Sequence, residues 1–387
     1  MVDVPEQRSI ISGIGISPIG RHTGIPGIEL TLSAARAAIA DAGITAAEVD
    51  GISTMGDTPL AETAAALGID PGYTGGGFDT GGLLSPFMSA CVAVAEGRAR
   101  HVLVYRTVQM FGGSILPAGE DPPAQQREAR LSSAMGDMAP LLTYHAYSAT
   151  NWLAMHCRRH MHLYGTTKEQ LGWLAINSRR NAGLNPLAVY RDPIRMDDYL
   201  GARMVSTPLS LLDCDVPVDG SIAFVVSAAE HADSCPRRPL RPLAFGGSGG
   251  VGGWIQRDDY PKMASVEAAA QMWNRTDLEA KDIDIAELYD GFTFLTVAWL
   301  EALGLCADGE AGPFVDGATR IALDGELPLN TYGGQLSAGR MHGYWVLHEA
   351  CVQLRGDAGE RQVAKQPEVA VVSNGGGPIA GCLLLTR

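Results

Sequence analysis

Predicted strands and helices alternate along much of this 387-residue chain. Ser9–Ile16 and Val49–Ser53 have the apolar pattern of strands, and residues 98–105 form a third, buried strand. Ile28–Ala42 and Leu83–Glu96 carry apolar side chains at helical spacing between those strands. Alternation of this kind predicts an α/β protein with a mostly parallel sheet covered by helices.

The second part of the chain repeats the pattern of the first. A helix end, a basic stretch and an apolar strand occur at 96–105 and again at 359–373. A glycine turn, small residues and an apolar closing strand occur at 218–230 and at 374–387. This repetition predicts two similar βαβ halves.

The division between the halves falls in the proline-rich stretch Pro236–Pro242. We therefore assign residues 1–235 to the first half and 236–387 to the second. The segment at about 115–215 is irregular and rich in Met, Pro, Tyr and His, which is typical of an inserted loop domain with a binding function.

Charge and hydropathy exclude several functions. A net charge of −14 argues against nucleic-acid binding, which needs clustered Lys and Arg. Apolar runs of about 18 residues do not occur, so a membrane span is not expected. The first ten residues lack a signal-peptide pattern, and the seven cysteines are scattered without a close pair. We expect reduced thiols and a cytoplasmic location.

The segment 330–356 contains a glycine turn that leads into a helix. Gly333 and Gly334 begin it, and Arg340, His342 and Tyr344 follow, which places three reactive side chains on one connection. Such a turn directs side chains at a ligand. The alternative is that Arg340 and His342 serve structure or partner contact.

Two further turns follow predicted strands. Tyr289 and Asp290 end the strand DIDIAEL, and Gly375 and Gly376 belong to the turn SNGGGPIAG. Open α/β sheets place their sites at such strand ends. Closely spaced glycines indicate exposed backbone amides or a close approach to ligand. Tyr289 as a half-buried structural phenol is the competing interpretation.

Other motifs carry weaker signals. His156 and His160 share one face of a helix, but Arg158 and Arg159 would repel a cation, so we expect surface or interface histidines and no metal site. The glycines of GIGIS and of the loop 246–253 do not match a dinucleotide fingerprint. That loop is either near a ligand or a flexible surface connection.

Several of these motifs together resemble the thiolase superfamily, in its lipid-transfer-protein branch. YGTTKEQLGWLAINSRRNAGLNPLA (164–188) resembles its loop-domain signature, and STPLSLLDCDVPVDGSIAFVVS (206–227) the end of its first half. Thiolases carry Asn-Glu-Ala-Phe where this chain has YDGF, and they carry the Gly-His-Pro turn where it has GGQLSAGRMHG. The thiolase motif Cys-x-Gly-Gly-Gly corresponds to SNGGG. The resemblance covers nearly the whole chain and implies a layered α-β-α-β-α core, a homodimer and an acyl-CoA substrate.

The departures from the thiolase pattern concern catalysis. The nucleophilic cysteine is missing from GGFDTGGLLSPF, where Asp79 and Thr80 stand, and Cys91 lies about three turns further on. The histidine position of the turn falls on Arg340, and the acid/base cysteine position falls on Ser373. Without an activated thiolate, acyl transfer through a thioester intermediate has no nucleophile.

This set of losses resembles the bacterial steroid side-chain aldolases, which cleave a β-hydroxyacyl-CoA by a retro-aldol reaction. The resemblance implies that Tyr289 and Tyr344 are the catalytic pair, without deciding which is acid and which is base. It also implies a small partner protein with an OB-fold acyl-CoA-binding domain, a heterotetramer of the two proteins, and no cofactor beyond the CoA of the substrate.

The chemistry explains why a thiolase fold would lose its cysteine. A tertiary β-alcohol cannot be oxidised to the ketone that thiolysis requires, whereas retro-aldol cleavage needs only two proton-transfer groups and a site for the enolate oxygen. Arg340 and His342 are candidates to stabilise a phenolate, and His342 or the glycine amides to hold the thioester oxygen. Asp290, Gly333, Gly334, Gly375 and Gly376 are the predicted substrate-binding residues.

Two other functions remain open on the sequence alone. A thiolase or acyl-CoA acyltransferase that uses another residue would form an acyl-enzyme at Cys91 or Cys382. A non-catalytic acyl-CoA or lipid carrier would bind without turnover and would tolerate changes at Tyr289.

Overall fold

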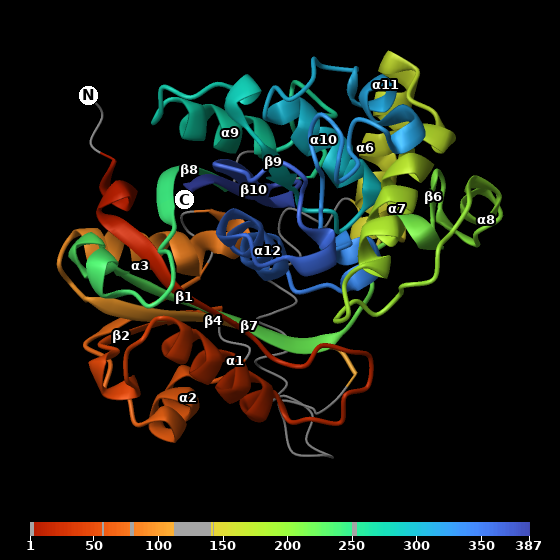
Figure 1. Ribbon diagram of the computed structural model, residues 1–387. Helices are drawn as coiled ribbons and strands as arrows, with labels where there is room; N and C mark the ends of the chain where they lie inside the picture. The colour runs from red at the N-terminus through yellow and green to blue at the C-terminus, as the bar shows by residue number, and fades with distance from the viewer. Residues whose placement is uncertain (1–3, 56–57, 78–80, 112–140, 142, 250–253) are drawn as a thin grey trace.

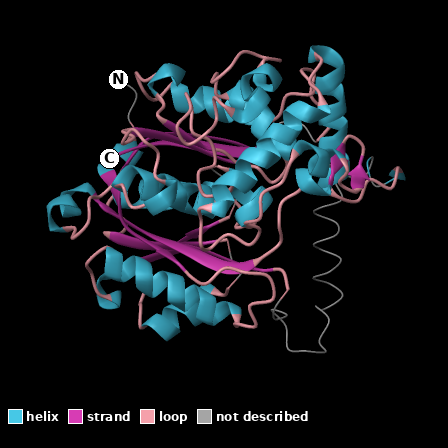
Figure 2. Ribbon diagram, turned by 45° about the vertical axis from the view of Figure 1, so that its right-hand side comes forward, coloured by secondary structure: helices cyan, strands magenta, loops and turns pink. Residues whose placement is uncertain are grey.

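The computed structural model describes residues 4–55, 58–77, 81–111, 141, 143–249 and 254–387. Outside these ranges lie Asp79 and Thr80, residues 112–140 at the start of the predicted insertion, and residues 250–253 of the glycine-rich segment. The described chain folds into five layers, in which two sheets alternate with three layers of helices (Figures 1 and 2). The predicted α-β-α-β-α architecture is confirmed.

The first sheet has five strands in the order β1-β7-β4-β2-β3. β2 pairs in parallel with both β3 and β4, whereas β7 runs antiparallel to β1 and β4. The strands are β1 (Ser9–Ile16), β2 (Gly51–Thr54), β3 (Tyr73–Gly76), β4 (His101–Gln109) and β7 (Asp219–Ala228). Every residue of β7 is buried, as expected for a strand covered by helices on both faces.

The second sheet has four strands in the order β8-β11-β10-β9. β9 and β10 are parallel neighbours, and β11 is antiparallel to β10 and β8. The strands are β8 (Arg241–Gly249), β9 (Ile285–Glu287), β10 (Val369–Gly376) and β11 (Ile379–Thr386). The sheets are therefore mixed rather than mostly parallel, because each half closes with an antiparallel strand.

Helices form the three remaining layers. Figure 1 shows α1 (Gly27–Asp41) and α2 (Leu60–Leu67) outside the first sheet, and α9 (Ser265–Trp273) and α10 (Thr293–Ala302) outside the second. Between the sheets lie α3 (Ser85–Ala95) and α12 (Tyr344–Arg355). All residues of α12 up to Leu354 are buried, so its surface is enclosed on every side.

Small residues let a helix approach each sheet closely. At Gly13 and Gly15 of β1 a Cβ atom would collide with backbone oxygens of α1. At Gly246 of β8 a Cβ atom would collide with the backbone oxygen of Ala268 in α9. The glycines of GIGIS therefore serve helix packing. The prediction of a loop at 246–249 is wrong, since these residues end β8.

The described part of the predicted insertion is mainly helical. It forms α6 (Ala149–Tyr164), α7 (Lys168–Gly183) and the short α8 (Met196–Leu200), followed by the small two-stranded sheet of β5 (Met204–Ser206) and β6 (Leu209–Ser210). These elements lie beside α10 and α11 (Ala311–Val315) at one end of the molecule (Figure 1). No helix of the described chain is long and apolar enough to cross a membrane.

Candidate active site

Three turns meet at the ends of β9 and β10. Ser373 and Asn374 are consecutive residues of β10. Ser373 is hydrogen-bonded to the turn that contains Tyr289, and Asn374 to the turn that contains His342. The backbone N–H of Tyr289 donates to Oγ of Ser373 at 3.0 Å, and Nδ2 of Asn374 donates to the carbonyl oxygen of His342 at 2.9 Å. Because β9 and β10 are parallel neighbours, their carboxyl ends bring these turns together.

Tyr289 is buried where β9 ends. Burial raises the pKa of its phenol above the usual range, the negative charge of Asp215 adds to this shift, and the positive charge of Arg340 opposes it. The phenol is consequently neutral at physiological pH. It is a proton donor in its resting state.

Arg340 lies beside Asp215, with 3.6 Å between Nη1 and Oδ2. The backbone N–H of Arg340 also donates to the carbonyl of Val216, the residue after Asp215, at 2.8 Å. Burial raises the pKa of Asp215 to about 6, and Arg340 limits the shift. Asp215 was not identified as a site residue from the sequence. It lies in the segment 206–227, which resembles the end of the first half of a thiolase.

His342 is bonded to Arg106 of β4. Nη2 of Arg106 lies 2.6 Å from Nδ1 of His342. A guanidinium can only donate, so Nδ1 accepts and the ring proton of neutral His342 resides on Nε2. Burial, followed by the charges of Arg106 and Arg340, holds the pKa of His342 well below its usual range. His342 is therefore a neutral imidazole with an Nε2–H donor.

Arg106 is the site residue that sequence reasoning missed most clearly. It is a buried arginine in β4, the strand HVLVYRTVQ. A single cation in an otherwise apolar strand is a signal in itself, because burying a charge without a partner is costly. The predicted strand ended at 105, one residue short of it.

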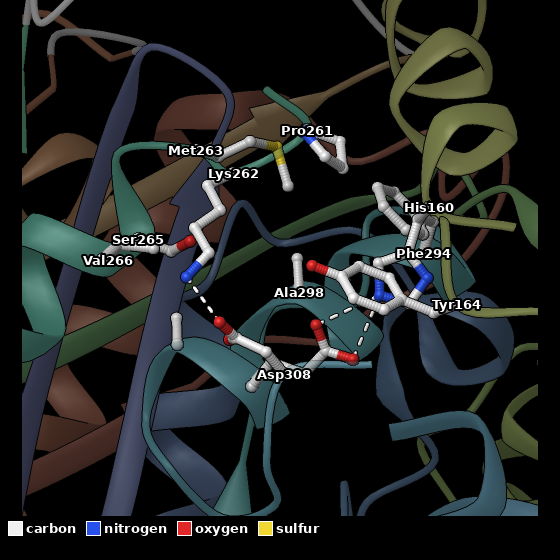
Figure 3. A pocket seen from close by; sticks show the side chains of 12 residues that line it. His160, Tyr164, Pro261, Lys262, Met263, Ser265, Val266, Phe294, Ala298 and Asp308 are labelled. Carbon is white, nitrogen blue, oxygen red and sulfur yellow. Dashed lines mark hydrogen bonds and ion pairs between the residues drawn. The ribbon is translucent and has the colours of Figure 1, made fainter. Parts of the chain in front are cut away.

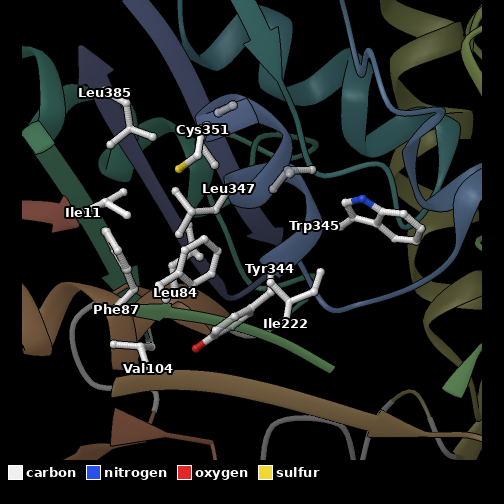
Figure 4. Packing of buried hydrophobic residues seen from close by; sticks show 14 of the residues in the cluster. Ile11, Leu84, Phe87, Val104, Ile222, Tyr344, Trp345, Leu347, Cys351 and Leu385 are labelled. Atoms are coloured by element: carbon white, nitrogen blue, oxygen red, sulfur yellow. The ribbon is translucent and has the colours of Figure 1, made fainter. Parts of the chain in front are cut away.

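Tyr344 is the first residue of α12 and is fully buried. Its ring lies 6.1 Å from that of Phe224, and it packs with Val104 and Ile222 of the first sheet (Figure 4). Tyr289 packs in the other large cluster of buried side chains, on the side of the second sheet. The structure thus places the predicted tyrosine pair at the ends of adjoining turns but in different packing environments.

Asp290 holds the turn that begins at Gly334. Its carboxylate accepts backbone N–H groups of Gln335 at 2.8 Å and Leu336 at 3.5 Å, and burial raises its pKa to about 7. A Cβ on Gly334 would collide with this carboxylate, and one on Gly333 with Ala182. Both glycines also have positive φ, so the turn needs them for its own geometry. Direct substrate contact by these three residues stays a prediction.

Gly375 and Gly376 end β10 with φ values of 74° and 148°. The carbonyl of Gly375 accepts a hydrogen bond from Nε1 of Trp299 at 3.0 Å, and a Cβ on Gly376 would collide with Leu295. The neighbouring amide of Gly377 donates to Sδ of Met263 at 3.0 Å. The amide of Gly377 is therefore engaged within the protein, whereas Nε2–H of His342 is a donor at the same group of turns and is our candidate for the thioester oxygen.

The cysteines lie in settings that favour the protonated thiol. Cys91 and Cys351 are buried and burial raises the pKa of each to about 12; the pKa of Cys382 is raised further. Cys214, next to Asp215, is partly exposed, and burial again raises its pKa to about 12. A thiolate nucleophile is therefore not prepared at any of these four positions.

The two histidines of α6 are buried, so of the two expected positions, surface or interface, the surface is wrong. His156 bonds the carbonyls of Pro261 at 2.9 Å and Trp254 at 2.6 Å. His160 contacts Glu301 at 3.0 Å and lines a cavity of about 30 Å³ (Figure 3). They join α6 to the second half of the chain, and among the described residues no His, Cys, Asp and Glu cluster fits a metal ion.

Two mixed sheets that enclose a pair of central helices, with three glycine-bearing turns at the strand ends, define a protein of the thiolase fold. Residues 253–383 match the family described as thiolase C-terminal domain-like. The chain is 33% identical to the steroid side-chain-cleaving aldolase of Thermomonospora curvata, over 97% of each protein. It belongs to the family of that aldolase.

Two further comparisons agree. The chain is 32% identical to the 17-hydroxy-3-oxo-4-pregnene-20-carboxyl-CoA lyase of Mycobacterium tuberculosis, over 97% of this chain and 99% of that one. A solved structure named as the Ltp2-ChsH2(DUF35) aldolase superposes with a TM-score of 0.89 at 31% identity, covering 100% of this chain and 99% of that one. The predicted relationship to the steroid side-chain aldolases is confirmed.

Proposed function

We propose that this protein is a carbon–carbon lyase that cleaves the side chain of a 17-hydroxysteroid acyl-CoA by a retro-aldol reaction. The substrate is of the 17-hydroxy-3-oxo-4-pregnene-20-carboxyl-CoA type, and the products are a 17-ketosteroid and propionyl-CoA. The family relationship supports the substrate class. The observation that carries the reaction type is the convergence of Tyr289, Arg340 and His342 at a site where the thiols are held protonated.

The reaction needs no covalent intermediate. A base removes the proton of the C17 hydroxyl, the C17 carbonyl forms, and the electrons of the bond between C17 and the α-carbon pass into the thioester. The resulting enolate is then protonated at the α-carbon. One proton leaves the substrate and one returns, so the bonds and charges balance without an oxidant or a second substrate.

His342 is assigned to the thioester oxygen. The Nε2–H of its neutral tautomer is a donor that strengthens its interaction as negative charge develops on that oxygen. Arg106 holds this tautomer through its 2.6 Å bond to Nδ1. Arg340 and Arg106 add positive charge around the enolate.

Tyr289 is assigned as the acid. Its raised pKa supports this role because the phenol holds its proton at neutral pH. Tyr344 is then the second proton-transfer group of the predicted pair. Arg106 hydrogen-bonds His342, two residues before Tyr344. We assign to this guanidinium the positive charge that a phenolate in a buried setting requires.

We further propose a cytoplasmic enzyme that is a homodimer and binds a small OB-fold acyl-CoA-binding partner, as a heterotetramer. The partner is supported by the similarity to a solved aldolase named with two components. The dimer is supported by β3, which lies at the edge of the first sheet and offers backbone groups to a second copy.

Phenylalanine substitutions test the assignment. Tyr289→Phe and Tyr344→Phe are each expected to lower turnover by about 10²- to 10⁴-fold, the usual contribution of a proton-transfer group. The measurement is formation of propionyl-CoA and ketosteroid by the complex with its partner. Tyr144→Phe, at a tyrosine that is 84% exposed, is the matched control. Near-normal turnover by a well-folded Tyr344→Phe protein would remove Tyr344 from the mechanism.

A further inference from the structure

A cavity of about 510 Å³ adjoins the candidate active site. Its wall includes Asp215 and Val216, which contact Arg340, and Leu336, which belongs to the turn held by Asp290. The volume lies within the range of small-molecule sites, about 300–1,000 Å³. No residue of this cavity was among the predicted site residues.

The wall of the cavity is joined to the catalytic turn on two sides. The N–H of Val216 donates to the carbonyl of Gln335 at 2.9 Å, and the N–H of Tyr190 donates to that of Ser337 at 3.0 Å. A molecule in the cavity is therefore in contact with segments that are hydrogen-bonded directly to the turn carrying Arg340 and His342. This connection suits the part of a substrate next to the bond that breaks.

Most of the lining is apolar. Leu211, Leu212, Val216, Pro217 and Leu336 supply aliphatic surface. Leu211 is 51% exposed and lies beside other apolar side chains of the wall, which leaves apolar area for a ligand to cover. Covering this surface with a rigid apolar body removes apolar area from water, which favours binding.

Three polar residues of the wall, Arg21, Arg179 and Tyr190, carry hydrogen-bond donors. Nη1 of Arg21 donates to the hydroxyl of Tyr190 at 2.5 Å, and the guanidinium carbon of Arg179 lies 5.3 Å from the centroid of the same ring. Because Arg21 supplies the proton of that bond, the O–H of Tyr190 is left to donate to another acceptor. Tyr190 is 37% exposed, so a ligand reaches it.

This combination fits a neutral carbonyl better than a phosphate. Nε of Arg179 is engaged by Ser337 at 3.0 Å and its Nη1 by the carbonyl of Asp192 at 3.2 Å. Asp215 in the same wall would repel an anion. A phenol that donates while an arginine supports it is a suitable partner for a ketone oxygen.

We infer that this cavity binds the fused-ring body of the steroid substrate, with Tyr190 and Arg21 recognising a carbonyl group on the rings. The inference rests on the proposed function and adds a subsite and a specificity to it. The relevant group is the 3-oxo function, which occurs in the substrate named for a relative. Tyr190 and Arg21 select between ring systems and take no part in bond cleavage.

Equilibrium binding of free ketosteroids tests the subsite without requiring catalysis. The probes are androst-4-ene-3,17-dione and a 17-ketosteroid that lacks the 3-oxo group, with the intact complex as receptor. Tyr190→Phe and Arg21→Met are expected to weaken binding of the 3-oxo steroid about fivefold, the value of one neutral hydrogen bond, and to leave the other steroid unchanged. Tyr144→Phe again serves as the control.

A second variant examines the apolar wall. Leu211→Trp adds volume at a position exposed enough to accept it. We expect a higher KM for the steroid acyl-CoA and an unchanged KM for a short tertiary β-hydroxyacyl-CoA without rings. Both substrates contain the reacting groups, so a change in the catalytic turn would affect them equally.

The outcomes separate the subsite from the proposed function. Equal loss for both steroids, no loss for either, or failure of the wild-type complex to bind them would overturn the subsite. Weaker binding of CoA alone in Tyr190→Phe or Arg21→Met would also overturn it and assign the cavity to CoA. Selective steroid binding without lyase activity would contradict the proposed function and leave the subsite standing.

Discussion

Arg106 on β4 and His342 in the turn before α12 form a hydrogen bond of 2.6 Å between Nη2 and Nδ1. The two residues are 236 positions apart in the chain and belong to the two different halves of the fold. The first half thus supplies the group that sets the protonation of a candidate catalytic residue in the second.

Removal of the Arg106 guanidinium is expected to make activity depend on the ionisation of His342. In Arg106→Met, Nδ1 loses its donor and a neighbouring positive charge, so the pKa of His342 rises toward its ordinary value. We expect a fall in kcat of about tenfold or more and a new ionisation in the pH profile of kcat between about pH 5 and 7.

Arg106→Lys is the matched variant, because it retains a cation and a donor. It is expected to keep the wild-type pH profile even where its rate is lower. A loss of activity in Arg106→Met without a new ionisation would show a structural role alone and would contradict the tautomer assignment.

Asp215 is expected to produce an acidic limb in the pH profile of kcat/KM. Its pKa is raised to about 6, so the carboxyl is ionised above that pH and gains a proton below it. Protonation removes the counter-charge of Arg340 beside Tyr289, and activity falls as the pH drops through about 6. Asp215→Asn should therefore lack this limb.

Asp290 is the control for that assignment, since burial raises its pKa to about 7. Asp290→Asn is expected to retain the limb, because its amide oxygen still accepts the N–H of Gln335, the shorter of the two bonds that the carboxyl makes to the turn. A limb that persists in Asp215→Asn and disappears in Asp290→Asn would transfer the ionisation to Asp290.

The thiols are expected to be dispensable. Cys214→Ser should retain at least about half of wild-type turnover, because burial keeps this thiol protonated and the mechanism makes no bond to sulfur. The intact mass of the enzyme during turnover is the measurement. An acyl adduct on any cysteine, or loss of activity on treatment with iodoacetamide, would favour the thiolase alternative.

A buried ionic group supports the site from behind. Arg361 contacts both carboxylate oxygens of Glu349, at 2.8 and 2.9 Å, and Thr331 links Glu349 to Glu287, two residues before Tyr289. Burial and the charge of Glu349 raise the pKa of Glu287 well above its ordinary value, so Glu287 is protonated.

Denaturant unfolding distinguishes the members of this group. Arg361→Met leaves the buried Glu349 charge without its cation and is expected to cost about 3 kcal/mol of stability. Glu287→Gln replaces a neutral acid by a neutral amide and should cost less than about 1 kcal/mol. Equal effects of the two substitutions would contradict the protonation assigned to Glu287.

Local sequence patterns were sufficient for most of the fold. β1 spans the predicted Ser9–Ile16, and α1 differs from the predicted helix by one residue at each end. These elements have a strong period and clear glycine or proline boundaries. The glycines at 246–249 were misassigned because close helix packing and a flexible loop both require residues without a side chain.

The site was only partly predictable for a related reason. Tyr289, Arg340 and His342 could be found because they occupy turns with recognisable spacing. Arg106 and Asp215 act through contacts with residues more than 100 positions away, and such contacts leave no local pattern. For His156 and His160 the sequence left surface and interface positions open, because nothing in a single helix shows that a second segment covers it.

The most direct test of the account is product formation from 17-hydroxy-3-oxo-4-pregnene-20-carboxyl-CoA in the absence of free CoA. A retro-aldol lyase releases propionyl-CoA and the 17-ketosteroid in equal amounts under these conditions, and added CoA does not raise the rate. Turnover that requires free CoA, or that yields no ketosteroid, would contradict proton-transfer cleavage at this site.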